Sequence, residues 1–118
     1  MSELEGLTER MRRFARDRDW EQFHTPKNLA MALAGEVGEL LAELQWLTPA
    51  EASEVMADPE AAARLRSEIA DVTLYLVRLA DVLGIDLVTA GHAKLDESDK
   101  RYTVEDYRGS ARKAPPLS

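Results

Sequence analysis

Four acidic side chains form two pairs with helical spacing. Glu36 and Glu39 stand three residues apart, and Glu68 and Asp71 repeat this spacing further along the chain. Residues three or four apart lie on one face of a helix, so each pair brings like charges together at some cost in stability. If the two helices pack antiparallel, four carboxylates converge, which is strongly unfavourable at neutral pH without a cation. The spacing therefore indicates a metal site.

The donor types narrow the choice of metal. All four ligands would be hard oxygen donors, the chain has no cysteine, and no histidine stands at the matching offsets, which favours Mg²⁺ or Mn²⁺ over zinc. Di-iron bundles add Glu-x-x-His pairs that this chain lacks, so that alternative ranks lower. A single Glu-x-x-Glu motif is usually a solvated helix face. Two matched motifs beside apolar seams bring the metal site level with that alternative, and the residues alone leave both open.

The sequence predicts four main helices that would position these acids. Thr25 before Pro26, and Asp58 before Pro59, are helix start signals, whereas Gly84 is a stop signal. We expect main helices at residues 3–19, 26–47, 59–83 and 86–98, with a short helix between the second and third. Apolar residues recur at steps of three and four in the second and third helices. The predicted fold is an all-α, up-and-down four-helix bundle.

Composition limits the classes of function. A chain of 118 residues forms one domain, and a net charge of −7 argues against binding nucleic acid through its phosphates. No apolar run approaches the length of a signal peptide core or a membrane span, so we expect a cytoplasmic protein without a membrane partner. After Arg101 the helical pattern weakens, and we expect a partly disordered tail.

The motifs together resemble a known enzyme family. The stretch "RDWEQFHTPKNLAMALAGEVGELLAELQW", followed by "EIADVTLYLVRLA" and a later "RY", resembles the MazG-like nucleoside triphosphate pyrophosphohydrolases, most closely their dCTP pyrophosphatase branch. The match spans about residues 12–102, so we expect a catalytic domain at 1–102 and a tail at 103–118. The resemblance implies an all-α oligomer, a homodimer or homotetramer. It also implies magnesium-dependent hydrolysis of a nucleoside triphosphate to the monophosphate and pyrophosphate.

The resemblance also implies roles for individual residues. Glu36, Glu39, Glu68 and Asp71 match the metal ligands, and Glu39 would in addition orient or deprotonate the attacking water. The substrate would be held by residues at three places in the sequence, namely the run Trp20, Glu21, Gln22, Phe23 and His24, the aromatics Trp46 and Tyr75, and the cations Lys94 and Arg101. Without the resemblance, the aromatics would be read as core, and the two cations as solvated surface.

Three positions depart from the pattern of the close relatives. Ser98 replaces an asparagine, Thr103 replaces a proline, and Met11 stands where members that prefer dCTP carry a histidine that contacts the substrate. The reaction is therefore predicted more firmly than the choice of cytosine, and dUTP or another triphosphate is an alternative substrate. An alternative from another class is a helical interaction module that has lost catalysis.

The oligomer also has some support from the residues themselves. The second predicted helix carries apolar surface outside its main seam. The residues that form this surface are Ala30, Met31, Ala34 and Leu41.

Overall fold

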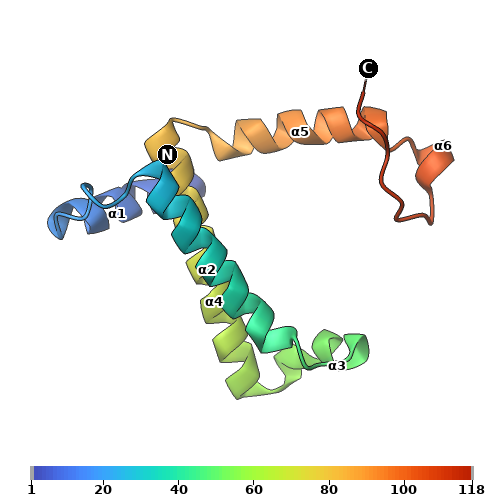
Figure 1. Ribbon diagram of the computed structural model, residues 1–118, viewed down its shortest axis with the longest axis horizontal. Coiled ribbons are helices and arrows are strands. Elements are labelled where there is room, and N and C mark those ends of the chain that lie inside the picture. Colours follow the sequence, from blue (N-terminus) through green and yellow to red (C-terminus); the bar gives the residue numbers. More distant parts are fainter. Residues whose placement is uncertain (1, 118) are drawn as a thin grey trace. The chain divides into compact units, whose positions relative to one another are not determined.

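The computed structural model describes residues 2–117, which are helical or irregular and contain no strand. The elements are α1 (Glu3–Asp17), α2 (Pro26–Leu44), α3 (Pro49–Ser53), the 3₁₀ helix η1 (Val55–Ala57), α4 (Pro59–Leu83), α5 (Leu87–Arg101) and α6 (Val104–Tyr107) (Figure 1). The chain divides into two compact units, the first ending at Gly84 and the second beginning at Ile85. The predicted all-α class is confirmed.

The helix starts follow the capping signals of the sequence. The Thr25 hydroxyl accepts a hydrogen bond from the backbone N–H of Asn28 at 3.3 Å, and Asp58 accepts one from Glu60 at 3.1 Å. These bonds satisfy backbone donors that would otherwise lack a partner in the first turn of α2 and α4. At the other end of α4, Gly84 adopts the left-handed conformation with φ of 71°, which glycine adopts without strain.

Three helix ends differ from the predicted ranges. The first helix stops at Asp17, before Asp19 adopts a positive φ of 55°, and α2 stops at Leu44 rather than at 47. The third difference is that α5 continues to Arg101 rather than ending near 98. The backbone N–H of Tyr102 still donates to the Ser98 carbonyl at 2.8 Å, so the last turn stays closed.

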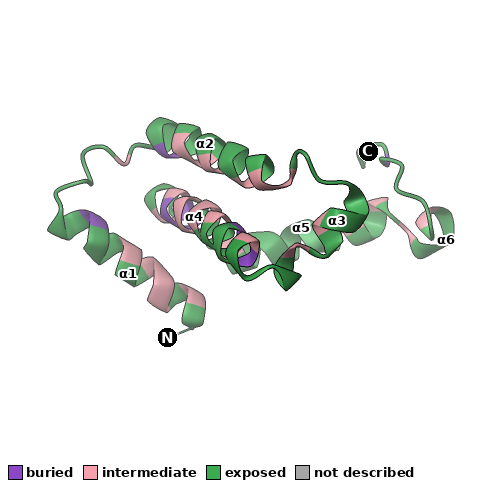
Figure 2. Ribbon diagram, turned by 90° about the horizontal axis from the view of Figure 1, so that it is seen from below, coloured by how far each residue is buried: buried purple, intermediate pink, exposed green. Residues whose placement is uncertain are grey.

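The core of the first unit lies along α4. Figure 1 shows that α2 and α4 run antiparallel and side by side, and Figure 2 shows α4 between α2 and α1. The buried apolar side chains of this unit are Ala15 of α1, Leu29 of α2, and Ala62, Leu65, Val77 and Ala80 of α4. Small residues dominate this set, which allows close approach of the helices. The predicted antiparallel packing of the two acid-bearing helices is therefore present.

An ion pair fixes α1 against α4. Two nitrogens of the Arg12 guanidinium, Nε and Nη2, donate to the two carboxylate oxygens of Asp81 at 3.1 and 2.6 Å. This forked geometry is stronger and more directional than a single contact. It aligns α1 with the C-terminal half of α4.

The second unit folds its tail back on α5. The Arg101 guanidinium donates to the carbonyls of Ala114 and Pro115 at 2.7 and 3.2 Å, and Ala114 is buried. The Tyr102 and Tyr107 rings meet edge to face with centroids 5.0 Å apart. The expected domain boundary at residue 102 and the partial disorder of 103–118 stay predictions, and Ser118 lies outside the described residues. Within residues 2–117, no helix combines the length and apolar character needed to cross a membrane.

Candidate active site

Three of the four predicted metal ligands come together where α2 packs on α4. Glu36 and Glu39 of α2, and Glu68 of α4, each offer a carboxylate oxygen within 4.8 Å of the others. Oε2 of Glu36 and Oε2 of Glu68 are buried and have no hydrogen-bond partner among residues 2–117. Buried acceptors without a donor are unfavourable, so this donor set fits a bound cation.

The electrostatics of this carboxylate cluster favour the same conclusion. The pKa of Glu36 and that of Glu68 are both raised, first by burial and next by the negative charge of Glu39. Asp71, three residues after Glu68 on α4, also raises both pKa values through its charge. Burial and like charges both disfavour ionised carboxylates, and a divalent cation would reverse this preference.

A cavity of about 500 Å³ has the fourth predicted metal ligand, Asp71, in its wall. Its walls come from α1, the segment between α1 and α2, and α4. The lining residues are Leu7, Arg10, Met11, Phe14, Trp20, His24, Asp71, Leu74, Tyr75 and Arg78. Trp20, His24 and Tyr75 were predicted from the sequence to bind substrate, and Asp71 was predicted to bind metal. The cavity is mostly apolar with a few polar groups, which is typical of sites for small organic ligands.

The aromatic wall of the cavity is held by ring contacts. The Trp20 ring meets the Phe14 ring edge to face, with centroids 5.6 Å apart, and meets the His24 ring at 6.3 Å. The Trp20 backbone N–H donates to the Ala15 carbonyl at 2.9 Å, which fixes the chain just after α1. Trp20 keeps 44% of its surface exposed, so part of the indole is open to a ligand. Such a face suits a planar, apolar ring.

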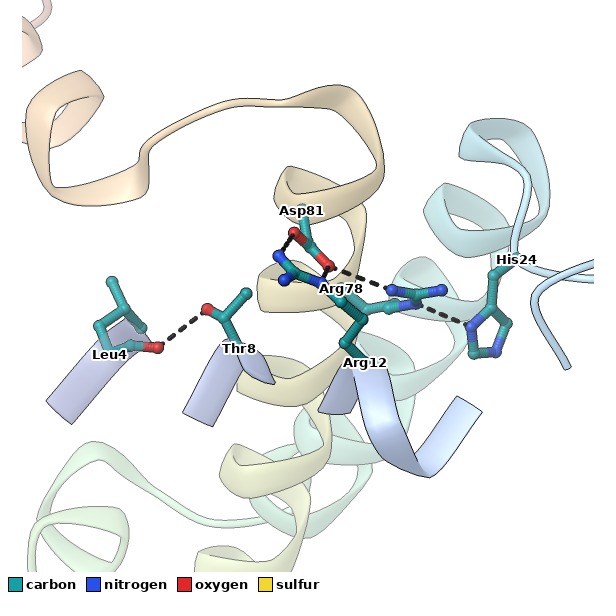
Figure 3. A network of polar contacts seen from close by, with 6 residues as sticks. All are labelled: Leu4, Thr8, Arg12, His24, Arg78 and Asp81. Atoms are coloured by element: carbon teal, nitrogen blue, oxygen red, sulfur yellow. Dashed lines mark hydrogen bonds and ion pairs between the residues drawn. The ribbon is translucent and has the colours of Figure 1, made fainter. Parts of the chain in front are cut away.

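His24 is held by a cation that sequence reasoning missed. Nε of Arg78 donates to Nδ1 of His24 at 3.0 Å, and Nη1 of Arg78 donates to Asp81 at 3.1 Å (Figure 3). Burial, followed by the charge of Arg78, lowers the pKa of His24. The sequence signal for this cation was the Arg78 and Asp81 pair, spaced three residues apart within the apolar run "YLVRLADVL".

Other predicted substrate contacts lie away from the cavity wall. Phe23 is 58% exposed and Trp46, just beyond α2, is 87% exposed. Glu21 and Gln22 are also exposed, and Gln22 donates to the Asp19 carbonyl at 3.0 Å. None of these four belongs to the cavity lining. Their roles in binding stay predictions.

The two predicted phosphate-binding cations belong to the second unit. Lys94 forms an ion pair with Glu97 at 3.3 Å on the surface of α5. Arg101 donates to the carbonyls of the folded tail. Both side chains therefore have polar partners within the second unit. Their contact with a phosphate stays a prediction.

Comparisons with known proteins agree with the predicted family. Residues 32–116 match the MazG-like family. The chain is 46% identical to dCTP pyrophosphatase 1 of Rattus norvegicus over 114 residues, which are 97% of this chain and 67% of the relative. It is 44% identical to dCTP pyrophosphatase 1 of Homo sapiens with the same coverage.

A solved structure shares the fold. The crystal structure of a pyrophosphatase from Archaeoglobus fulgidus superimposes with a TM-score of 0.81 at 36% identity, covering 87% of this chain and 94% of the other. The helical architecture, the acids converging from α2 and α4, and these similarities lead to one conclusion. The chain belongs to the MazG-like family.

Proposed function

We propose that this protein is a magnesium-dependent pyrophosphohydrolase that converts dCTP, or a modified dCTP, into the monophosphate and pyrophosphate. The observation that carries the proposal is the position of Asp71. Its side chain lines the cavity, and its charge acts on Glu36 and Glu68. A nucleotide with its base in the cavity would thus place its phosphates near the carboxylate cluster. The relatives named dCTP pyrophosphatase 1 support the choice of substrate.

The carboxylates would hold the metal. Glu36, Glu39, Glu68 and Asp71 supply hard oxygen donors, and the two buried oxygens without hydrogen-bond partners fit a cation of the Mg²⁺ type, with Mn²⁺ as a substitute. When bound, magnesium neutralises phosphate charge and polarises the phosphorus centre for attack. The side chains of the protein then have to position the attacking water and the nucleobase.

Glu39 is the carboxylate best placed to act on water. It is exposed, whereas Glu36 and Glu68 are half-buried. We assign to Glu39 the orientation or deprotonation of the water that attacks the α-phosphorus. The new bond joins the water oxygen to this phosphorus, and the bond to the oxygen bridging the α- and β-phosphorus breaks. Pyrophosphate leaves, and the nucleoside monophosphate remains.

The base would occupy the cavity. Trp20 and Tyr75 offer aromatic faces for stacking, and His24 offers a polar contact. By resemblance to the family, Glu21, Gln22, Phe23 and Trp46 would complete the substrate site, and Lys94 and Arg101 would meet the phosphates. We assign these six residues from the resemblance alone.

We further propose a homodimer or homotetramer. Met31 and Leu41 are exposed on α2, and Trp46 just beyond this helix is exposed as well. Large exposed apolar side chains that cluster on one helix favour a contact with another chain. The lack of cysteine and the charge of −7 support a cytoplasmic location and argue against nucleic acid as a partner.

A product analysis tests the proposed reaction. The purified chain is incubated with magnesium and each common or 5-substituted deoxynucleoside triphosphate, and the products are separated. We expect monophosphate and pyrophosphate, with dCTP or a 5-substituted dCTP turned over fastest. Release of orthophosphate would contradict attack at the α-phosphorus. No turnover with magnesium or manganese would favour the non-catalytic module.

A single substitution tests the assigned role of Glu39. Glu39→Gln keeps the shape of the side chain but removes its charge, and we expect turnover to fall by about 10²-fold or more. Without metal, the melting temperature should stay at or slightly above that of the wild type, because Glu39 is exposed and its charge opposes those of Glu36 and Glu68. Glu9→Gln, at an exposed position on α1, is the matched control and should keep full activity.

Met11 favours a second candidate substrate. It lines the cavity, where the resemblance places a substrate-contacting histidine in members that prefer dCTP. A thioether at this position offers no comparable hydrogen bond to cytosine. dUTP or another non-standard triphosphate is therefore the alternative. The base ranking in the product analysis decides between them.

A further inference from the structure

Arg78 is a buried cation with two defined partners. Only 5% of its surface is exposed, and it reaches Asp81 and Nδ1 of His24 (Figure 3). Arginine stays protonated at any pH the protein experiences, so its Nε–H can only donate. Nδ1 of His24 must therefore accept. This hydrogen bond assigns the proton of a neutral imidazole to Nε2.

The charges around Arg78 favour the neutral form of His24. Asp81 accepts hydrogen bonds from both Arg12 and Arg78, so one carboxylate balances two guanidinium groups. The remaining positive charge lies next to the imidazole. This charge adds to the effect of burial, which is the larger cause of the lowered pKa of His24. The other charged or titratable groups that line the cavity are Arg10, Asp71 and Tyr75.

The second nitrogen of His24 is available for a ligand. His24 lines the cavity, and among residues 2–117 no acceptor takes a hydrogen bond from its Nε2. A neutral N–H donor suits an uncharged acceptor, such as a ring carbonyl oxygen or an unprotonated ring nitrogen of a pyrimidine. An unpaired donor of this kind discriminates against bases that lack the acceptor.

We propose that Arg78 is a positioning residue that fixes His24 as a neutral Nε2–H donor to an acceptor atom of the nucleobase. Asp81, which is itself bound by Arg12, holds the guanidinium of Arg78 in place. The identity of the acceptor as a base atom rests on the proposed nucleotide substrate. The state of the imidazole rests on the geometry of His24 and Arg78 alone.

Nuclear magnetic resonance tests the state of the imidazole without any nucleotide. The chain has two histidines, so the His92→Gln variant leaves His24 as the single imidazole. His92 is exposed on α5, in the second unit, and does not belong to the cavity lining. The ¹⁵N shifts of the full-length variant should show the proton on Nε2, with a titration midpoint below the ordinary 6.5. A proton on Nδ1 would overturn the proposal.

Substitution of Arg78 in the same background tests its control over His24. Arg78→Met removes the donor and the charge, but Asp81 keeps Arg12 as its partner. The titration midpoint of His24 should rise, and both tautomers should appear. Arg78→Lys keeps the charge without the forked geometry, so the midpoint should stay low while the tautomer preference weakens. A His24 titration that is unchanged in Arg78→Met would reject the assigned role of Arg78.

A pair of substitutions at His24 tests the donor function. The amide nitrogen of Gln reaches about as far as Nε2 of His, whereas the amide of Asn reaches only about as far as Nδ1. His24→Asn should therefore raise KM for dCTP roughly three- to tenfold with kcat little changed, the pattern of a lost binding contact. His24→Gln restores a donor at the position of Nε2 and should therefore raise KM less than His24→Asn does. Because this pair leaves Arg78 intact, it remains decisive even if Arg78→Met fails to fold.

The outcomes separate this inference from the proposed function. If the wild type hydrolyses none of the triphosphates, the proposed function and the base contact both fail, and the resonance experiment alone decides the role of Arg78. If the wild type is active but His24→Asn and His24→Gln have equal KM values, the base contact is wrong. The proposed function would then stand.

Discussion

The candidate site has two parts, the carboxylate cluster and the cavity, and a single residue connects them. Asp71 lines the cavity and adds its charge to the surroundings of Glu36 and Glu68. Met11 lines the same cavity from α1 and offers a flexible, apolar side chain. Under the proposed function, the reaction and the choice of base therefore depend on different residues. They should respond separately to substitution.

The Met11→His variant tests whether residue 11 determines which nucleobase the protein prefers. We expect the added ring to supply a hydrogen bond and to raise kcat/KM for dCTP over dUTP by roughly three- to tenfold. Steady-state kinetics with both triphosphates would measure the ratio. Met11→Leu has a similar volume without a polar group and should leave the ratio unchanged. If Met11→His leaves the ratio unchanged too, Met11 is not placed to contact the base.

Some residues of the candidate site could be predicted from the sequence and others could not, for a physical reason. Glu36, Glu39 and Glu68 were predictable because helix geometry turns spacing into proximity once two helices pack antiparallel. Arg78 was missed, because a single cation on a helix is usually solvated and its spacing from Asp81 marks only a local ion pair. Its burial depends on His24 and Asp81 converging from two parts of the chain. No local pattern encodes that convergence.

At the scale of elements, α4 is shared by both halves of the site. It contributes Glu68 to the carboxylate cluster and Tyr75 to the cavity, and it binds α1 through Asp81. The range of α4 was predicted without error because Asp58, Pro59 and Gly84 mark both of its ends. The end of α5 was not, because the Arg101 contacts are made to backbone carbonyls, which any residue can supply.

Asp81→Asn tests the connection between α1 and α4. At pH 7 the change removes the carboxylate that binds two guanidinium groups, and we expect a loss of about 2 kcal/mol in the free energy of unfolding. Urea denaturation would measure this loss. Asp17→Asn is the matched control. Its carboxylate is 68% exposed and lies 3.9 Å from Arg16, so its effect should stay within about 0.5 kcal/mol.

The effect of Asp81→Asn should depend on pH with a defined sign. The hydrogen bond from Arg12 is the main cause that lowers the pKa of Asp81 below its ordinary 3.8. A carboxylate with a lowered pKa in the folded state stabilises the protein above its unfolded pKa. This stabilisation is lost as pH falls through the folded value. The difference between wild type and Asp81→Asn should therefore shrink below pH 3.8, and a constant difference would contradict the assignment.

Magnesium should stabilise the contact between α2 and α4. A ligand that binds only the folded state adds about 2.7 kcal/mol at a hundredfold excess over Kd. We expect thermal melting to shift upward with magnesium and to return when the metal is chelated. The double variant with Glu36→Gln and Glu68→Gln should lose this shift, and it should melt above the wild type in the absence of metal because two half-buried charges beside Glu39 are gone. Equal magnesium shifts in both proteins would place the metal elsewhere.

At the scale of the whole molecule, one chain leaves apolar surface uncovered. Met31 and Leu41 are exposed on α2, and a methyl group added at Gly35 or Gly38 would meet nothing within 4 Å. The sequence predicted apolar surface on this helix. It could not show whether the same chain or a second copy covers this surface, because identical subunits carry the same residues. The proposed oligomer accounts for this open face.

Leu41→Glu tests the proposed oligomer. A charge placed in an apolar contact is costly, so sedimentation should show a shift from dimer or tetramer toward single chains. Glu54→Gln changes an exposed side chain outside α2 and should leave the assembly unchanged. A wild type that sediments as a single chain would refute the proposal directly.

The unequal surroundings of the two tryptophans have an optical consequence. Trp20 lies in the cavity wall against Phe14, whereas Trp46 is almost fully in contact with solvent in the single chain. The fluorescence of an indole depends on the polarity around the ring. The two tryptophans should therefore contribute different emission to one spectrum. Light from Trp20 follows the occupancy of the cavity, and light from Trp46 follows what covers the end of α2. The protein therefore carries two distinct intrinsic signals, one from the cavity and one from the end of α2.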